Sequence, residues 1–468
     1  MHPLQQPSQH QGAQSARPVP KVRTGGSPVS VSVAASLALM GDSLLYAVLA
    51  AEAPALGIPL VSVGLLLSAN RFVRLVTNSL AGAVYHRYGR EWPYFLAMVA
   101  SAFTTFAYGL PIGFAFFLLA RLAWGTCWSF LNLGMYLSVL EHSDERTRGQ
   151  WMGRIKSISR IGTIGAVTLG AYLTDLVGFR PVVFGMGVLA LAGAAVSLGD
   201  VRAAVQNGRR RTGTALRAEV PSRSEGRDAA HGGQAADAGP GQPVHAPDPA
   251  QQTRPLAQPQ TRPQIQPQAQ PQAQPGRVYI LHFLGFIFGF IMNGVVVGTL
   301  ALLVLQRYGE SVGLFGTVLG AATLSGLLLG VRWVAEIAWG PLAGAVGDRV
   351  GAERAVLVSA AAMAAGLAGL AWASGPHLLI LLETGVFVAG VTLSVCLDSV
   401  VGRVAIGTNR VNKVMSLYVT AQDLGSALGP LVGYLVGVGV GLEGLYVGAS
   451  LLLVFGALLS AAAHRRVA

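Results

Sequence analysis

The sequence predicts an all-α polytopic membrane protein with twelve transmembrane helices in two pseudo-symmetric six-helix bundles. Of its 468 residues, 52 % are hydrophobic and only 12 % are charged, whereas a soluble domain carries roughly 25 % charged residues. Apolar runs long enough to cross a bilayer, which takes ~20 residues each, recur along most of the chain. Such runs must be helical, because a helix satisfies its own backbone hydrogen bonds in lipid.

The apolar runs fall into two groups of six. The first group is expected at 30–52, 58–84, 93–111, 113–140, 150–177 and 180–199, and the second at 278–306, 312–345, 353–374, 377–406, 411–437 and 441–464. An N-terminal bundle is therefore expected at 29–199 and a C-terminal bundle at 277–468. The 60 glycines agree with this, because small residues let membrane helices pack closely.

Two segments have a different character. Residues 1–28 lack the apolar stretch of a cleavable signal peptide, and we expect a disordered cytoplasmic tail there. Residues 200–276 contain the run PQTRPQIQPQAQPQAQPGR. Proline and glutamine at this density cannot build a core, so this segment is predicted to be a disordered cytoplasmic linker between the bundles.

Arginine and lysine set the expected orientation. They gather in alternate loops, at Arg87, Arg90, Arg146, Arg148, Arg154, Arg349, Arg354, Arg410, Lys413, Arg465 and Arg466. The intervening loops carry only Arg180 and Arg307. Because loops rich in Arg and Lys stay in the cytoplasm, both termini are expected there, in a multi-pass protein of the plasma (inner) membrane.

Charge and cysteine content exclude several other classes. The net charge of +12 could indicate a nucleic-acid partner, but the positive residues lie between apolar runs, as orientation in a membrane requires. Cys127 and Cys396 are the two cysteines, and both fall inside apolar runs, so neither a disulfide framework nor a metal site is expected. No phosphate-binding loop of the GxxxxGK[ST] kind occurs. We therefore expect neither an enzyme nor a cofactor.

An internal repeat relates the two groups of spans. LAGAVYHRYGRE at 80–91 returns as LAGAVGDRVGAE at 342–353. Each copy follows the second apolar run of its group. Such a match at corresponding loops indicates a duplicated six-span unit.

These loops resemble the signature loop of the major facilitator superfamily. GDRVGAER at 347–354 is similar to that family's Gly-x-x-x-Asp-Arg-x-Gly motif followed by basic residues. The matching positions are Gly82, Arg87, Gly89 and Arg90 in the first copy, where His86 replaces the acid, and Gly344, Asp348, Arg349, Gly351 and Arg354 in the second. RLAWG at 121–125 resembles the family's fourth-span pattern. The resemblance implies a monomeric secondary transporter whose two bundles rock about a cavity near the bilayer midplane.

Two interpretations of the loop motif stay open. It is either a topology anchor held by its basic residues or a latch that holds one conformation. In the second case, Gly82 and Gly344 would let a helix meet a neighbour closely. Asp348 would lie against the positive N-terminal end of an adjacent helix.

Charged residues inside the spans are the candidate substrate or proton sites, because burying an unpaired charge in a membrane is expensive. Asp42 lies near the middle of the first span, and Asn293 occupies a comparable place in the seventh. Asp42 is the leading site; the alternative is a carboxylate neutralised by a structural hydrogen bond. Arg121 and Glu383 are further cavity candidates, and pairing between spans is their alternative. No metal ligands are predicted.

Opposite charges occupy duplicated positions. The repeat alignment relates Arg74 to Glu336, and Arg160 to Asp423. The resemblance places the second span against the eleventh and the fifth against the eighth. We therefore predict two inter-bundle gates, Arg74–Asp423 and Arg160–Glu336, on the cytoplasmic side, closed when the cavity faces outward and broken when it faces inward.

The alternative to these gates is that each charge pairs within its own bundle. Arg332, for instance, is one helical turn from Glu336. Arg71, three residues before Arg74, is expected either to reach the same acid or to point into the cavity as a substrate-binding residue.

The function predicted from these observations is secondary active transport of a small solute by alternating access. Proton coupling through Asp42 is the working hypothesis, and export is favoured over uptake. The partners would be a small-molecule substrate, protons and the lipid bilayer, with no nucleic acid. A different class remains open, a non-transporting membrane receptor or scaffold that acts through the basic linker.

Overall fold

The computed structural model describes residues 26–144, 147–218, 275–314, 316–408 and 410–465. The predicted tail up to residue 25 and residues 219–274 of the predicted linker lie outside the described part of the chain. The described residues before Gly208 and from Pro275 onward form one compact unit, and the following description concerns that unit.

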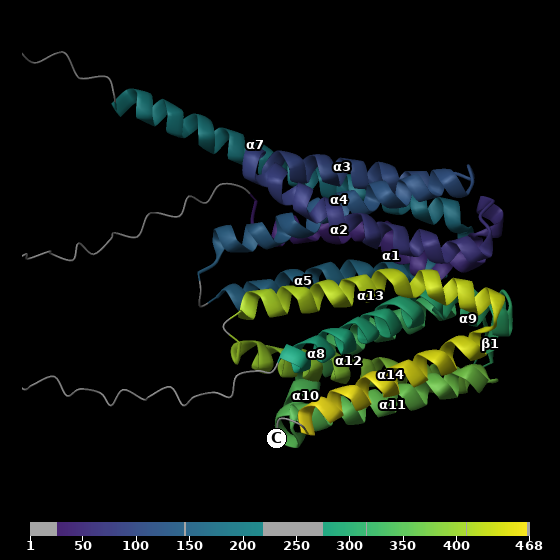
Figure 1. Cartoon of the computed structure of the whole chain (residues 1–468). Coiled ribbons are helices and arrows are strands. Elements are labelled where there is room, and N and C mark those ends of the chain that lie inside the picture. The colour runs from purple at the N-terminus through teal and green to yellow at the C-terminus, as the bar shows by residue number, and fades with distance from the viewer. Residues whose placement is uncertain (1–25, 145–146, 219–274, 315, 409, 466–468) are drawn as a thin grey trace, which may run out of the picture. The chain divides into compact units, whose positions relative to one another are not determined.

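The N-terminal half is helical throughout (Figure 1). Its elements are α1 (Pro28–Glu52), η1 (Pro54–Leu56), η2 (Leu60–Ser62), α2 (Val63–Tyr88), α3 (Glu91–Tyr108), α4 (Phe114–His142), α5 (Arg148–Gly165), η3 (Ala166–Gly170), α6 (Ala171–Val177) and α7 (Phe179–Ala218). The η3 segment is a π-helical stretch whose flanking residues are also helical. It joins α5 and α6 into one continuous pass.

The C-terminal half repeats this pattern and adds two short strands. Its elements are α8 (Pro275–Phe288), η4 (Gly289–Val296), α9 (Val297–Tyr308), β1 (Ser311–Leu314), β2 (Thr317–Gly320), α10 (Ala321–Val350), α11 (Ala352–Trp372), α12 (Pro376–Ile406), α13 (Val411–Gly439) and α14 (Leu442–Arg465). The η4 segment is again π-helical and joins α8 to α9. Counted as continuous passes, the described helices cross twelve times, six in each half.

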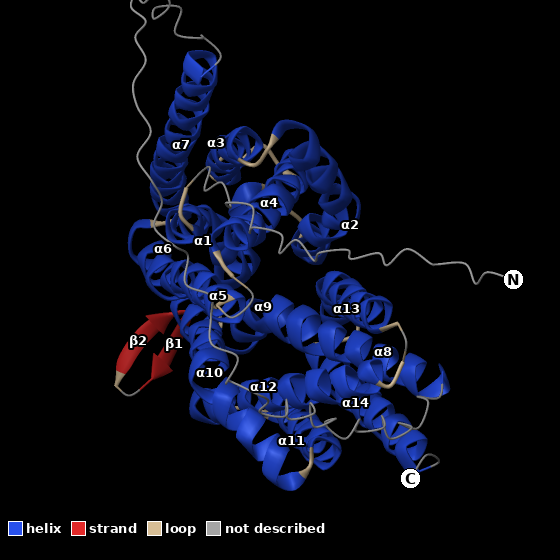
Figure 2. Cartoon of the chain, turned by 90° about the vertical axis from the view of Figure 1, so that its left-hand side faces the viewer, coloured by secondary structure: helices blue, strands red, loops and turns tan. Residues whose placement is uncertain are grey.

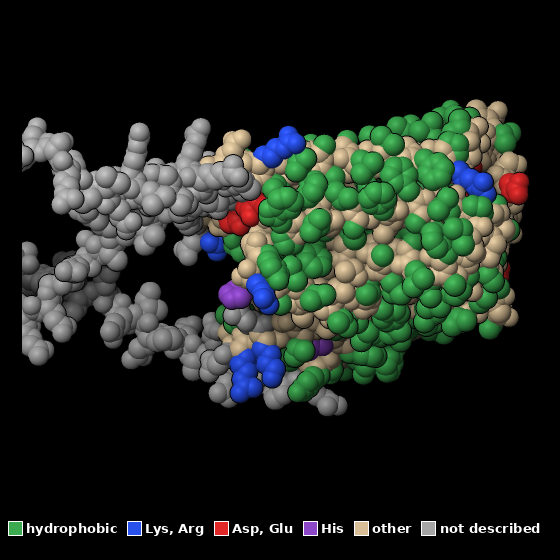
Figure 3. Space-filling model, turned by 90° about the horizontal axis from the view of Figure 1, so that it is seen from above, with side chains coloured by type: hydrophobic (Ala, Val, Ile, Leu, Met, Phe, Trp, Pro, Cys, Tyr) green, Lys and Arg blue, Asp and Glu red, His purple; other side chains and the backbone are tan. Residues whose placement is uncertain are grey.

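The described helices suit a membrane. Nine of them are long and apolar enough to cross a bilayer by length and composition alone. The passes formed by α3, by α5 with α6, and by α13 are not among those nine. Apolar side chains cover the middle of the face seen in Figure 3, and most charged side chains lie toward its two ends. This distribution is that of a protein whose middle contacts lipid tails.

Two ends of the unit can be distinguished, and we name them by their contents. The hairpin side holds β1 and β2, and the terminal side holds the start of α1 and the end of α14 (Figure 1). On the terminal side, Ser30 Oγ near the start of α1 donates to Asp200 of α7 at 3.2 Å.

Residues 311–320 differ from the predicted helix at 312–345. Strands β1 and β2 form an antiparallel pair in which Ser311 lies opposite Gly320 and Leu314 opposite Thr317. The hairpin lies beside α10 (Figure 2). Gly316 in its turn has φ 78°, a left-handed conformation that glycine adopts without steric cost. The helix α10 begins only at Ala321 and runs on to Val350.

The helix of the predicted sixth span is longer than expected. Helix α7 continues to Ala218, beyond the predicted end at 199 and into the predicted linker. The sequence DVRAAVQNGRRRTGTALRA at 200–218 contains no proline and several good helix formers. Nothing in it breaks the helix before Pro221.

The two halves meet along specific helix pairs. Helix α2 packs against α13, and α5, η3 and α6 pack against α10, while α1 contacts α9 and α10. These include the two neighbour pairs that the resemblance implied. Two glycines allow close approaches to backbone atoms of the other half: a Cβ at Gly326 would lie 1.8 Å from the Val167 carbonyl oxygen, and one at Gly64 would lie 2.4 Å from the Pro430 carbonyl oxygen.

Candidate functional site

A cavity of about 610 Å³ lies between the two halves. Residues of α1, α2, α4, α5, η3, η4, α9, α10 and α13 form its wall. It extends from Asp42 in the middle of α1 to Tyr136 of α4 and Lys156 of α5. The last two residues lie about two turns from the terminal-side ends of their helices, so the cavity extends toward the terminal side.

Contacts between the halves hold the hairpin side together. Asp175 of α6 accepts a hydrogen bond from the Thr323 backbone N–H at 2.7 Å and another from the Thr323 hydroxyl. Asp175 therefore satisfies a free N–H at the start of α10 and adds a negative charge at that helix N-terminus. Nearby, the Leu431 N–H of α13 donates to Ser68 Oγ of α2 at 3.1 Å.

Asp42 lies on the cavity wall and is paired. Its carboxylate forms an ion pair with Arg121 of α4, and Asn70 Nδ2 donates to Asp42 Oδ1 at 3.1 Å. Arg121 is fully buried, donates from Nε to the Leu66 carbonyl oxygen at 2.9 Å, and is not part of the wall. The pair links α1 to α4 inside the N-terminal half, so the charge of Asp42 is compensated by a side chain behind the wall.

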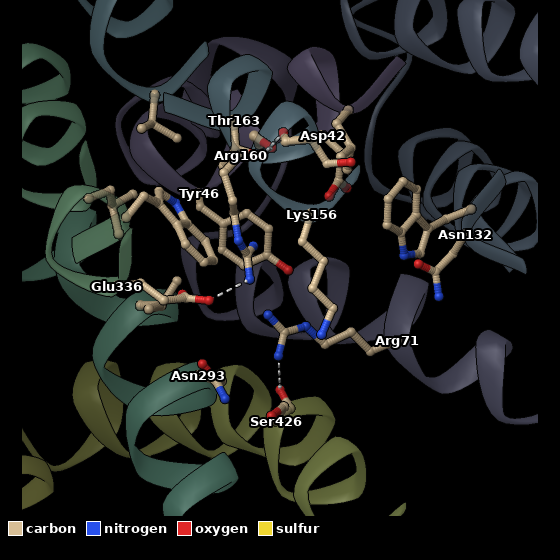
Figure 4. Close-up of a pocket in the computed structure, with 18 of the residues that line it drawn as sticks. Asp42, Tyr46, Arg71, Asn132, Lys156, Arg160, Thr163, Asn293, Glu336 and Ser426 are labelled. Atoms are coloured by element: carbon tan, nitrogen blue, oxygen red, sulfur yellow. Dashed lines mark hydrogen bonds and ion pairs between the residues drawn. The ribbon is translucent and has the colours of Figure 1, made fainter. Parts of the chain in front are cut away.

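Arg160 and Glu336 join the two halves across the cavity. Arg160 NH2 of α5 lies 3.0 Å from Glu336 Oε1 of α10 (Figure 4). The Arg160 guanidinium also stacks over the Trp333 ring at 3.8 Å. The predicted gate was to be broken when the cavity faces inward. Here the Arg160–Glu336 pair is formed although the cavity extends toward the terminal side and the hairpin side is closed. The two long side chains can meet because α5 and α10 are in contact.

The second predicted gate is not joined in this structure. Arg74 and Asp423 both line the cavity. Among the residues that the structure describes, neither side chain has an ion-pair or hydrogen-bond partner. The proposed contact between them stays a prediction.

Arg71 reaches across to the other half through a backbone atom. Its NH1 donates to the Ser426 carbonyl oxygen of α13 at 3.0 Å, and its guanidinium lies 5.7 Å from the centre of the Tyr46 ring. The Ser426 carbonyl is available because Pro430, four residues later in α13, has no N–H to donate to it.

Asn293 and Arg332 also lie on the wall and contact each other. Arg332 NH2 donates to Asn293 Oδ1, and its guanidinium stacks over the Trp333 ring at 4.0 Å. Arg332 was expected as an alternative partner of Glu336, but the structure pairs Glu336 with Arg160. Asn293 lies in the π-helical η4, a helix type that is frequent at functional sites.

Glu383 is placed away from this cavity. The side chain is fully buried in α12, and neither carboxylate oxygen has a hydrogen-bond partner among the described residues. It is not on the cavity wall. Glu383 was expected as a cavity candidate, and the structure places it within the C-terminal half.

The loop motifs lie on the terminal side and behave differently in the two copies. Arg90 is buried and lies 3.1 Å from Glu141 at the end of α4. Gly89 and Gly351 have φ of 77° and 91°, which explains why both copies need glycine there. Asp348, Arg349 and Arg87 are exposed.

The expected role of the first motif glycine is not what the structure shows. A Cβ at Gly82 would meet nothing within 4 Å, and one at Gly344 would lie 3.9 Å from a Val395 methyl group. The close helix approaches occur at other glycines, both within a half, as at Gly289 and Gly425, and between the halves, as at Gly326.

Several wall residues were missed by sequence reasoning. They are Lys156, Trp124, Trp128 and Trp333. Lys156 precedes Arg160 by four residues, so both lie on one face of α5, and that spacing could have found it. Among the described residues, no group of three or more His, Cys, Asp or Glu side chains is arranged to hold a metal ion.

The chain is similar in sequence and in fold to known membrane proteins. A family model described as "Major Facilitator Superfamily" matches residues 31–430. The synaptic vesicular amine transporter of Homo sapiens is 29 % identical over 141 residues, which are 30 % of this chain and 27 % of that protein. The protein of the same description from Rattus norvegicus matches to the same extent. The matched stretch thus spans about a quarter of these relatives.

Solved structures show the same fold at low identity. A POT family transporter in complex with 5-aminolevulinic acid has a TM-score of 0.64 and 11 % identity over 92 % of this chain and 94 % of that one. The nucleoside transporter NupG has a TM-score of 0.63 and 13 % identity, over 93 % and 98 %. A bacterial homologue of the human lysosomal transporter Spinster has a TM-score of 0.64 and 12 % identity, over 94 % and 96 %.

Proposed function

The chain belongs to the Major Facilitator Superfamily, and from this premise we propose that it carries a small solute across its membrane by alternating access. Members of this family are multi-pass membrane transporters and not enzymes. The proposal concerns the direction of transport, the coupling ion and the orientation of the chain.

The observation that carries the proposal is the placement of inter-half contacts around the cavity. On the hairpin side, Asp175 and Thr323 link α6 to α10. Toward the terminal side, Arg160 and Glu336 link the continuation of the same two helices. Polar contacts at two levels of one helix pair can form and break as the halves rock, so that a bound solute becomes accessible to each side in turn.

Proton coupling is proposed at Asp42. This carboxylate lies on the wall and holds a buried partner, Arg121. A proton arriving through the cavity would neutralise Asp42 and leave Arg121 without its counter-charge. Because an uncompensated buried charge is strongly destabilising, protonation would change the relative stability of the conformations.

Export from the cytoplasm is the proposed direction, in a monomer in the plasma (inner) membrane with both termini cytoplasmic. The Arg and Lys residues of alternate loops support this orientation. The cavity extends toward the terminal side, so a solute in the cytoplasm would be the one to enter it. The amine named for the vesicular relatives is not proposed as substrate, because the cavity wall carries more Arg and Lys than acids.

The test is solute-driven proton movement in proteoliposomes. Purified protein would be reconstituted with the pH-sensitive dye pyranine inside, and candidate solutes added on either side. The proposal expects a solute-dependent pH change that empty liposomes lack. Solute flux with no accompanying pH change would remove proton coupling, and the absence of flux for every solute that binds the purified protein would overturn transport itself.

A further inference from the structure

The charges on the cavity wall do not balance. Among the described residues that line it, five are cationic and three are acidic. The cations are Arg71, Arg74, Lys156, Arg160 and Arg332, and the acids are Asp42, Glu336 and Asp423. The wall therefore carries a surplus of two positive charges before any partner behind it is counted.

The ion pairs that two of the wall acids form increase this excess of positive charge in one part of the wall. Asp42 is held by Arg121, which is not part of the wall, and Glu336 is held by Arg160. Asp423 is the only wall acid without an ion-pair partner among the described residues. Four wall cations form no ion pair within the described part of the chain. Arg332 donates to Asn293, which leaves Arg71, Arg74 and Lys156 to be set against this single acid.

These three cations come from two helices of the N-terminal half. Arg71 and Arg74 are one turn apart on α2, and Lys156 is on α5. Figure 4 shows the Lys156 side chain extending toward Arg71. Within the part of the chain that the structure describes, the only polar contact of Arg71 is with a backbone carbonyl oxygen, and Lys156 has no hydrogen-bond partner. Like charges brought together inside a membrane protein are costly unless an opposite charge lies between them.

Aromatic rings lie beside these cations. Trp124 and Trp128 of α4 stack with their ring centres 5.8 Å apart and nearly parallel, and both line the cavity. Tyr46 of α1 lies next to Arg71. The wall thus combines aromatic rings with charged side chains that can fix the orientation of a ligand, and its volume of about 610 Å³ is within the range of small-molecule sites.

We propose that the cavity binds an organic anion, with its carboxylate between Arg71 and Lys156 and its apolar ring against the aromatic residues of α1 and α4. This inference rests on the proposed transport function and names the substrate class. Arg74 and Asp423 line the same cavity and offset each other's charge, so Arg71 and Lys156 are the cations assigned to the ligand. An amine would instead have to bind where the unpaired cations of the wall outnumber the unpaired acid Asp423.

The test compares three ligands of one shape and different charge. The probes are 1-naphthylacetate, its neutral amide 1-naphthylacetamide, and the cation 1-naphthylethylamine, added to the purified full-length protein. Their binding would be measured by isothermal titration calorimetry and by the shift in unfolding temperature. The anion is expected to bind at least about tenfold more tightly than the amide, and the amine not to bind.

Substitutions then locate the carboxylate. Lys156→Gln and Arg71→Gln are each expected to weaken binding of the anion by about tenfold while leaving that of the amide unchanged. Lys413→Gln and Arg180→Gln, which remove exposed cations outside the cavity, are the matched controls and should change neither. Equal binding of anion and amine, or anion binding unaffected by both cavity variants, would overturn the proposal.

These measurements separate the two proposals. Anion binding that depends on Lys156 without any flux in proteoliposomes would overturn transport and leave the anion site standing. Flux of a cation or neutral solute, with no binding of the anion, would overturn the anion site and leave transport standing.

Discussion

Arg160 of α5 and Glu336 of α10 form a 3.0 Å ion pair that links the N-terminal half of the chain to the C-terminal half. Both side chains are partly exposed, at 36 % and 42 %. Exposed pairs of this kind contribute only about 0.2–1 kcal/mol to stability. Their importance would therefore lie in which conformation they favour, and charge reversal can separate that effect from folding.

Reversal of this pair is the first prediction. Arg160→Glu is expected to lower transport roughly tenfold, because two acids would repel each other between α5 and α10. Adding Glu336→Arg should restore part of the activity. The unfolding temperature should move little in either variant, and initial flux in proteoliposomes is the measurement. A double reversal no more active than the single variants would argue against a functional pair.

The second prediction concerns Arg74 and Asp423, which share the cavity wall without an ion pair. If they meet only in another conformation, Arg74→Asp should impair flux and the addition of Asp423→Arg should recover part of it. Neither variant should change stability in the conformation described here, because no contact is lost. Identical flux defects in Asp423→Arg alone and in the double variant would sink this second gate.

The third prediction is that Asp42 carries protons and Arg121 serves it. Asp42→Asn leaves a buried arginine unpaired and should lower stability, since breaking a buried pair costs about 3–5 kcal/mol. The double variant Asp42→Asn with Arg121→Gln removes both charges and should recover much of the unfolding temperature. Solute-driven proton movement should remain absent in both.

The control for this experiment is Glu443→Gln, which neutralises an exposed acid and should preserve proton movement. Recovery of wild-type proton movement and pH dependence in the double variant would assign the pair a structural role only.

The fourth prediction is that Asp175 holds the hairpin side closed. Asp175→Ala removes the cap on α10, a loss of about 0.5–2 kcal/mol, and should increase opening on that side. The readout is labelling of Leu39→Cys, a wall position, by an impermeant maleimide from the hairpin side after Cys127→Ser and Cys396→Ala. Labelling should rise several-fold.

Glu310→Ala provides the comparison, because Glu310 is an exposed acid on the same side whose side chain does not cap α10. Equal labelling of the Asp175 and Glu310 variants would show that the cap does not govern opening.

The fifth prediction separates transport from a scaffold role. Replacing residues 205–275, which include the basic cluster Arg209, Arg210 and Arg211, by a short Gly/Ser segment should leave the unfolding temperature and solute flux of the protein unchanged, since both are proposed to depend on the helices of the two halves. A scaffold that works through the basic linker would lose its function in this variant. Loss of flux with normal folding would give the linker a role that the transport proposal lacks.

Much of the fold could be predicted because hydropathy and length decide which segments enter a membrane. The first span, expected at 30–52, is α1 at Pro28–Glu52. The prediction of a helix at the start of the eighth span was wrong. The segment GESVGLFGTVLG at 309–320 is apolar enough to suggest a helix, but its glycines favour a hairpin. Composition averaged over a window cannot register that difference.

The site could be predicted only where the repeat constrained it. Arg160 and Glu336 were paired correctly because two independent statements, the repeat alignment and the neighbouring spans, limited the partner of each. Nothing constrained the partner of Asp42, because its distance to Arg121 depends on how α1 and α4 are rotated about their axes. The excess of positive charge on the cavity wall was missed for the same reason, since the sequence does not show that the Lys156 side chain extends toward Arg71 of α2.

The proline in α13 links solute binding to the contact between halves. Pro430 leaves the Ser426 carbonyl without its helical donor, and Arg71 of the opposite half takes that place. An anion bound in the cavity and this carbonyl oxygen would compete for one guanidinium. Occupancy of the site and adhesion of α2 to α13 would then be thermodynamically linked, each weakening the other. Binding of the solute would weaken the contact between α2 and α13 that stabilises the present conformation. The binding free energy of the solute would then contribute to the conformational change that releases it.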